Sequence, residues 1–126
     1  MKRILIIDDN VQFVTLLKEY FSEDYLVYSH TDFKDLNDII LKVSQLLPDI
    51  ILLDVNLLKT NGIQVVKSLQ QNSLLKKIPV IMLTASDYNS VTESLLKKEP
   101  NVFGFYSKLS PLESIKEKIE SINKKE

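Results

Sequence analysis

Short runs of consecutive apolar residues, each ended by a polar side chain, constrain the fold of this chain most strongly. Residues 50–53 read Ile-Ile-Leu-Leu and end at Asp54. Four apolar residues without polar alternation predict a strand buried on both faces, as in a parallel sheet covered by helices. Residues 4–7 and 78–84 follow the same pattern. We therefore expect at least three fully buried strands.

Segments with helical spacing of apolar residues separate these runs. They are residues 11–21, 36–47, 65–69 and, with a weaker pattern, 86–98. A last helix is predicted from a capping box, with Ser110 as N-cap, Pro111 at the first helical position and Glu113 completing the box. Residues 25–29 and 103–106 are shorter strand candidates, rich in aromatic and β-branched side chains.

The alternation of five predicted strands with five predicted helices indicates an α/β fold with a doubly wound parallel sheet. Right-handed connections favour the flavodoxin-like strand order 2-1-3-4-5. The chain has 126 residues, which falls in the usual range for one domain. We expect residues 1–126 to form a single domain.

Composition excludes several functional classes. The 16 basic and 17 acidic residues give a net charge of -1, so no overall field favours nucleic acid or an anionic membrane. The absence of cysteine excludes a disulfide framework, thiol catalysis and a cysteine zinc site. No apolar run approaches the roughly 20 residues that span a bilayer. We expect a soluble cytoplasmic domain.

Polar side chains that could carry chemistry follow the predicted strands. Asp8 and Asp9 follow the first strand, Asp54 the third, Thr84 the fourth and Lys108 the fifth. The carboxyl ends of parallel strands meet at one edge, where open α/β sheets bind their ligands. Carboxylates crowded there repel one another unless a cation lies among them, and Mg²⁺ suits such oxygen ligands. Aspartate can also form covalent phosphoryl intermediates.

This constellation resembles the receiver domain of two-component response regulators (CheY-like) over essentially the whole chain. Gly62 after Asp54 and Ala85 after Thr84 strengthen the match. The resemblance implies that Asp54 accepts a phosphoryl group, assisted by Lys108 and Thr84. It also implies Mg²⁺ ligands and switch residues. The implied ligands are Asp8 (mainly through water), Asp9, Asp54 and the backbone carbonyl of Asn56, and the implied switch residues are Thr84 and Phe105.

The resemblance also implies partners. The phosphoryl group would come from a sensor histidine kinase or a phosphotransfer protein, and the surface of the fourth helix, fifth strand and fifth helix would bind a downstream effector protein or output domain. Such a domain assists only its own phosphorylation and dephosphorylation and is not otherwise an enzyme. The sequence ends after the last predicted helix, so we expect either a stand-alone regulator or one module of a longer protein.

Some positions depart from the family pattern. The family usually has a proline, joined by a cis bond, after its lysine, and this chain has Leu109. A cis bond before a residue other than proline costs about 2.5 to 4 kcal/mol, so we expect a trans peptide. Leu57 and Leu58 replace a usual Met-Pro pair, and residues 99–102 replace a glycine-containing turn.

These departures keep an alternative open, in which the chain is a degenerate receiver that binds proteins without being phosphorylated. A flavodoxin-type cofactor binder is disfavoured because the chain has only two glycines and its acidic pair would repel a cofactor phosphate. A haloacid-dehalogenase enzyme is disfavoured because Asp8-Asp9 lacks the Asp-x-Asp spacing of that class. His30, the sole histidine, is predicted to be a solvated loop residue.

Overall fold

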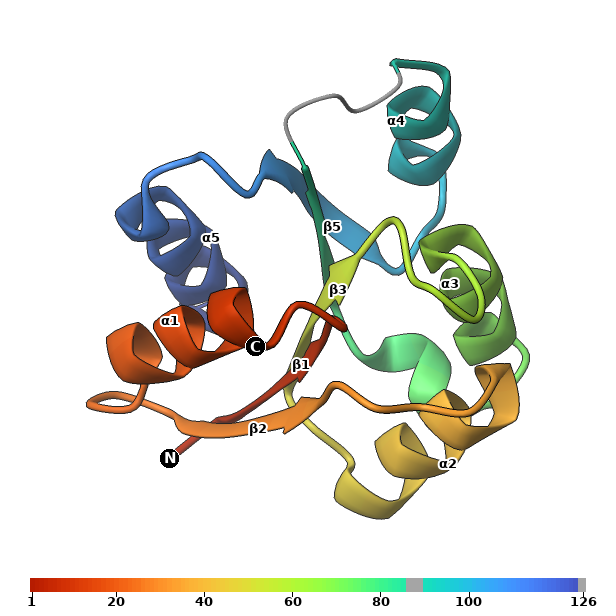
Figure 1. Cartoon of the computed structure of the whole chain (residues 1–126), viewed down its shortest axis with the longest axis horizontal. Helices are drawn as coiled ribbons and strands as arrows, with labels where there is room; N and C mark the ends of the chain where they lie inside the picture. The colour runs from red at the N-terminus through yellow and green to blue at the C-terminus, as the bar shows by residue number, and fades with distance from the viewer. Residues whose placement is uncertain (86–89, 125–126) are drawn as a thin grey trace.

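The computed structural model describes residues 1–85 and 90–124. Within these residues, five parallel strands form one sheet in the order β2-β1-β3-β4-β5 (Figure 1). The strands are β1 (Arg3–Ile7), β2 (Leu26–His30), β3 (Ile50–Asp54), β4 (Val80–Thr84) and β5 (Val102–Ser107). This confirms the predicted flavodoxin-like, doubly wound sheet.

Helices cover both faces of the sheet. The helices are α1 (Val11–Phe21), α2 (Leu36–Leu46), α3 (Gly62–Gln70), α4 (Ser90–Lys97) and α5 (Leu112–Lys124), with a short 3₁₀ helix η1 (Leu75–Lys77) before β4. Helices α1 and α5 lie on one face, and α2, α3 and α4 lie on the other (Figure 1). Of the helices in the described part of the chain, none is long and apolar enough to cross a membrane.

Side chains of the central strands alternate between two hydrophobic cores. Leu5 and Ile7 of β1 pack in the core under α2, α3 and α4, whereas Ile4 and Ile6 pack in the core under α1 and α5. Each of these four side chains is fully buried. A strand covered on both faces needs no polar alternation, which explains the uninterrupted apolar runs of the sequence.

Polar side chains cap the helices that follow β1 and β3. The side-chain oxygen of Asn10 accepts a hydrogen bond from the amide of Phe13 at the start of α1. Asn61 accepts in the same way from the amide of Gln64 at the start of α3. These caps satisfy amide groups that the first helical turn leaves without a partner. They fix where each helix begins relative to the strand before it.

Several predicted boundaries are wrong by a few residues. The weak helix predicted over residues 86–98 ends one residue earlier, at Lys97; its predicted start falls on residues 86–89, which lie outside the described residues. The last helix begins at Leu112, so Pro111 precedes it. The predicted strand 78–84 begins only at Val80, because Pro79 has no amide hydrogen to donate to the neighbouring strand.

His30 was predicted as a solvated loop residue, and this is wrong. It is the last residue of β2, and its side chain is only 16% exposed. Its Nε2 lies 3.6 Å from Asp38 Oδ2 of α2, and its carbonyl accepts a hydrogen bond from the amide of Asp8. The strand is one residue longer at this end than its aromatic and β-branched residues indicated.

A buried polar cluster lies at the amino end of the sheet. Asn101, which precedes β5 and is 2% exposed, donates to the carbonyl of Val66 over 3.2 Å and accepts from Gln70 Nε2 over 2.8 Å. Gln70 Nε2 also donates to Glu99 Oε2 over 2.8 Å. We call these four residues the Asn101 cluster. It fastens α3 to the loop between α4 and β5.

Candidate functional site

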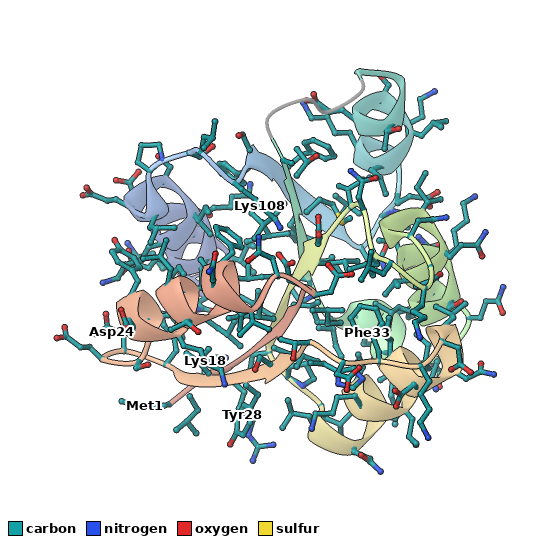
Figure 2. The ribbon with its side chains drawn as sticks, viewed as in Figure 1. Met1, Lys18, Asp24, Tyr28, Phe33 and Lys108 are labelled. Atoms are coloured by element: carbon teal, nitrogen blue, oxygen red, sulfur yellow. The ribbon has the colours of Figure 1, made fainter. Side chains whose placement is uncertain are left out.

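The polar residues predicted at the strand ends meet at the carboxyl edge of the sheet. Asp8 directly follows β1, Asp54 ends β3, Thr84 ends β4 and Lys108 follows β5. Figure 2 shows Lys108 beyond the end of β5, on the side of the sheet that α1 and α5 cover. Because β1, β3 and β4 are adjacent and parallel, their last residues are brought together by the fold itself.

Three carboxylates form the centre of this site. Asp8, Asp9 and Asp54 each offer an oxygen, and these oxygens lie within 4.8 Å of one another. Asp8 is 1% exposed and Asp54 is 6% exposed. Desolvation by burial, together with the nearby charge of Asp8, raises the pKa of Asp54 from 3.8 to about 6, although Lys108 partly opposes this. The site therefore holds more negative charge than its surroundings neutralise.

Lys108 is the cation that faces these carboxylates. Its Nζ lies 2.7 Å from Asp8 Oδ2 and 3.4 Å from Asp54 Oδ2. The amide of Lys108 donates to the carbonyl of Thr84 over 2.6 Å, so the backbone is also tied to the end of β4. Among the described residues no peptide bond is cis, so the Lys108–Leu109 peptide is trans, the form that the energetic cost of a cis bond favours.

The donor set fits a hard divalent cation such as Mg²⁺. All the offered ligand atoms are carboxylate oxygens, which Mg²⁺ prefers. Within the part of the chain that is described, the buried Asp8 Oδ2 accepts no hydrogen bond, although it pairs with Lys108. One ammonium group against three carboxylates leaves room for further positive charge. Asp8, Asp9 and Asp54 are the residues that could hold the ion.

The loop after β3 folds closely over the site. The amide of Leu58 donates to Asp9 Oδ2 over 2.8 Å, and the amide of Asn56 donates to Asp54 Oδ1 over 3.2 Å. A side chain at Gly62 would bring its Cβ to 3.0 Å from Val55 Cα and 3.1 Å from the carbonyl oxygen of Asp54. Glycine therefore lets α3 begin close against the end of β3, where a Cβ would force its neighbours to shift. A ligand role for the Asn56 carbonyl stays a prediction.

The two predicted switch residues lie on neighbouring strands. Thr84 is 1% exposed at the end of β4. Phe105 lies in β5 beside Met82 of β4, is half-buried, and packs against the core under α2, α3 and α4. That core includes Leu96 of α4. The structure thus brings Phe105 near α4, and its role as a switch stays a prediction.

One residue near the site received no role from the sequence. The Nζ of Lys108 lies 4.8 Å from the ring centroid of Phe13 in α1. Phe13 falls in the first turn of the helix that follows the acidic pair, and a residue there faces back toward the strand end. That spacing is the signal that could have identified it.

Comparison with known proteins agrees with this fold and site. The response regulator receiver domain family matches residues 4–120. The alkaline phosphatase synthesis transcriptional regulatory protein PhoP of Bacillus subtilis is 38% identical over 86 residues, which are 68% of this chain and 34% of PhoP. The chain thus spans about a third of the length of this relative.

Solved structures show the same fold. A response regulator from Desulfuromonas acetoxidans superposes with a TM-score of 0.83 at 19% identity, covering 98% of both chains. The chemotaxis response regulator CheY4 of Vibrio cholerae superposes with a TM-score of 0.82 at 20% identity, covering 97% of this chain and 98% of CheY4. These likenesses extend over nearly the whole chain, and the family match covers all the strand-end residues described above. The chain belongs to the response regulator receiver domain family.

Proposed function

We propose that this domain accepts a phosphoryl group on Asp54 from the phosphohistidine of a sensor histidine kinase or phosphotransfer protein. The observation that carries the proposal is the gathering of Asp54 with Asp8, Asp9 and Lys108 at one edge of the sheet. A carboxylate oxygen of Asp54 forms the new bond to phosphorus. The bond between phosphorus and the histidine nitrogen breaks, and that nitrogen keeps the electron pair. Because the other ring nitrogen of the phosphohistidine carries a proton, the histidine leaves as neutral imidazole.

Protonation of Asp54 limits this reaction. A carboxylic acid is a poor nucleophile, so transfer requires the ionised form. Because the pKa of Asp54 is raised to about 6, the ionised form predominates above that pH. Transfer to Asp54 should therefore become faster as the pH rises through about 6. A bound cation would lower this midpoint, since positive charge favours the carboxylate.

Charge neutralisation is the second requirement. A phosphoryl group in transfer carries negative charge on its oxygens, and fixed positive charge aimed at them lowers the barrier. Lys108, 3.4 Å from Asp54 Oδ2, is within reach of one side of that group. Mg²⁺ bound by Asp8, Asp9, Asp54 and the Asn56 carbonyl would supply further positive charge. Asp9, whose Oδ2 accepts from the Leu58 amide, also holds the loop after β3 in place.

The phosphorylated site would signal through β4 and β5. The acyl phosphate carries about 1.5 to 2 negative charges on its phosphoryl oxygens, which the hydroxyl of Thr84 can approach. Phe105 would then turn inward into the space that Thr84 leaves. The strand register supports this coupling, since Phe105 of β5 pairs with Met82, two residues before Thr84 on β4. The surface of α4, β5 and α5 would change in response and bind a downstream effector protein or output domain.

The remaining expectations follow from this role. The domain would assist its own phosphorylation and dephosphorylation and act as an enzyme on nothing else. With a net charge of -1, it would make no direct contact with nucleic acid and would not insert into a membrane. Its proposed location is the cytoplasm.

Intact-protein mass spectrometry tests this proposal. The protein is incubated with Mg²⁺ and acetyl phosphate, a small phosphodonor, at pH 7.5. We expect the mass of one phosphoryl group to be added to the wild type and not to Asp54→Asn. The added group should be lost after brief treatment with hydroxylamine, which cleaves acyl phosphates. Equal labelling of both proteins would contradict Asp54 as the acceptor.

A second candidate function is protein binding without phosphorylation. The observation in its favour is the pair of exposed apolar side chains beside the site, Leu58 at 84% and Leu109 at 79% exposure, where the family usually has prolines. This candidate predicts no added phosphoryl group with acetyl phosphate or with a phosphorylated histidine kinase. The same mass measurement therefore distinguishes the two functions.

A further inference from the structure

Lys108 makes one contact near the site that is not with a carboxylate. Its Nζ lies 4.8 Å from the centroid of the Phe13 ring, inside the distance of about 6 Å at which a cation is attracted to an aromatic face. The side chain of Lys108 is 16% exposed, so water screens this attraction only in part. The Phe13 ring is therefore positioned to influence where the ammonium group rests.

Phe13 is itself held firmly. Its amide donates to Asn10 Oδ1 over 3.1 Å at the N-cap of α1. Its side chain is half-buried and packs against the core under α1 and α5. Asn10 in turn donates from its amide to Asp8 Oδ1 over 2.9 Å. The ring is thus fixed relative to the acidic pair by one short, hydrogen-bonded turn.

The backbone beyond Lys108 does little to fix its side chain. Leu109 is 79% exposed and follows a trans peptide. Its amide donates to Ser107 Oγ over 3.0 Å, which is a contact within the same turn. The location of the ammonium group then depends on Asp8, Asp54 and the Phe13 ring. The attraction between the carboxylates and the ammonium group changes when the carboxylates bind another cation or when Asp54 becomes esterified. The attraction between the Phe13 ring and the ammonium group does not change.

We propose that Phe13 is a positioning residue, whose ring face keeps the Lys108 ammonium group beside Asp54 during phosphoryl transfer. The expected effect of Phe13 on the rate of phosphorylation rests on the proposed function. The contact itself is independent of that function. A purely structural role for Phe13, as an apolar side chain that fills space, is the alternative that the experiment must exclude.

Variants of Phe13 separate the two roles. Phe13→Leu keeps an apolar side chain and removes the aromatic face, whereas Phe13→Tyr keeps the face. Tyr20→Leu is the matched control, because Tyr20 is also on α1 and lies 5.8 Å from the ammonium of Lys116, away from the site. The rate of phosphorylation by acetyl phosphate is measured for each at saturating Mg²⁺.

We expect Phe13→Leu to slow phosphorylation about 3- to 10-fold, which is the size of a cation–π attraction at a partly exposed site. Phe13→Tyr and Tyr20→Leu should stay within about twofold of the wild type. In a Lys108→Ala background, Phe13→Leu should cause no further loss. An equal loss in both backgrounds would overturn the inference in favour of a structural role.

Nuclear magnetic resonance of the metal-free protein tests the contact without any reaction. We expect the ε-methylene protons of Lys108 to be shifted upfield by the Phe13 ring and to show nuclear Overhauser effects to its protons. The upfield shift should disappear in Phe13→Leu and persist in Phe13→Tyr. Random-coil shifts in the wild type would overturn the inference even if Phe13→Leu failed to fold. Absence of phosphorylation in the wild type would instead count against the proposed function.

Discussion

The two ends of the sheet bury polar groups in opposite ways. At the amino end, Asn101 is 2% exposed and both its donor and its acceptor have partners. At the carboxyl end, Asp8 and Asp54 are equally well buried but repel each other, and this repulsion helps to raise the pKa of Asp54. A satisfied polar cluster stabilises a fold, whereas crowded carboxylates cost stability unless a ligand compensates them.

This difference indicates that the functional site lies at the carboxyl end of the sheet. Groups with strongly shifted pKa values collect at functional sites, where their arrangement serves a reaction rather than stability. In the Asn101 cluster both hydrogen bonds of Asn101 join neutral groups, and its one carboxylate, Glu99, accepts from Gln70 and lies 3.5 Å from the ammonium of Lys67. This cluster should affect only stability. The four predictions below test this contrast through the free energy of unfolding, measured with urea.

The largest effect is expected from removing the cation at the carboxyl end. Lys108→Met should destabilise the metal-free protein by about 3 kcal/mol at pH 7.5, because breaking a buried pair leaves carboxylates without compensation. Lys67→Met is the matched control at the amino end. The Lys67 side chain is 60% exposed, so its loss should cost less than about 0.5 kcal/mol. Equal losses of stability in Lys108→Met and Lys67→Met would contradict the difference between the two ends of the sheet.

Asn101→Ala should destabilise the protein by about 2 kcal/mol, since it removes the two hydrogen bonds that the buried Asn101 side chain makes with Val66 and Gln70. The loss should be the same at pH 5 and pH 8. Phosphorylation by acetyl phosphate should remain within about twofold of the wild type. A loss below about 0.5 kcal/mol would mean that the cluster does not hold α3 to the loop between α4 and β5.

Asp54→Asn should have the opposite sign and stabilise the protein. The folded pKa of Asp54, about 6, lies above its ordinary value of 3.8, so the ionised carboxylate opposes folding. The contribution of Asp54 is most favourable below pH 3.8 and is lost as the pH rises through about 6. This shift corresponds to at most about 3 kcal/mol, and screening at the open edge reduces the expected gain to about 1 to 2 kcal/mol above pH 6.

The gain from Asp54→Asn should vanish well below pH 3.8, where the wild-type carboxyl is neutral in both the folded and the unfolded state. Asp24→Asn is the control, because the side chain of Asp24 is 51% exposed. It should change stability by less than about 0.5 kcal/mol. A destabilised Asp54→Asn variant at pH 8 would show that Lys108 outweighs both burial and repulsion.

The smallest effect is expected at Leu47, near the amino end. Leu47 is the C-cap residue that follows α2; it lies in the left-handed region, at φ 47° and ψ 62°, and is 50% exposed. A side chain with a Cβ is strained in this conformation, whereas glycine is not. Leu47→Gly should therefore stabilise the protein by about 0.5 to 1 kcal/mol at every pH. Leu41→Gly, inside α2 and also exposed, should instead destabilise by about 1 kcal/mol.

The sequence predicted the fold and the strand-end residues because both depend on local patterns. Apolar runs ended by Asp8, Asp54 and Thr84 identify buried strands, and parallel pairing then brings their ends together. The spacing of Phe13 after the acidic pair places it near the site, but its contact with Lys108 also depends on how α1 and the loop after β5 approach each other. The Asn101 cluster likewise joins residues about 30 positions apart.

The burial of His30 could not be predicted from the sequence for a different reason. Its position beside a strand end was predicted, but its burial depends on Asp38 and on Phe33, whose ring lies 5.6 Å away. Those neighbours come from the segment after β2 and from α2, and a single polar residue in a sequence gives no indication of them. Some predicted ends of helices and strands were wrong for a similar reason, because hydrogen bonds between elements decide where a strand ends.

The most direct measurement is the free energy of unfolding at pH 7.5 as a function of Mg²⁺ concentration, for the wild type and Asp54→Asn. The account holds that the three carboxylates bind a divalent cation only when folded. Wild-type stability should rise with the logarithm of Mg²⁺ concentration above the dissociation constant, by about 1.4 kcal/mol per tenfold increase. Asp54→Asn, with one carboxylate fewer, should need a much higher concentration. An equal or absent response in both proteins would contradict the account.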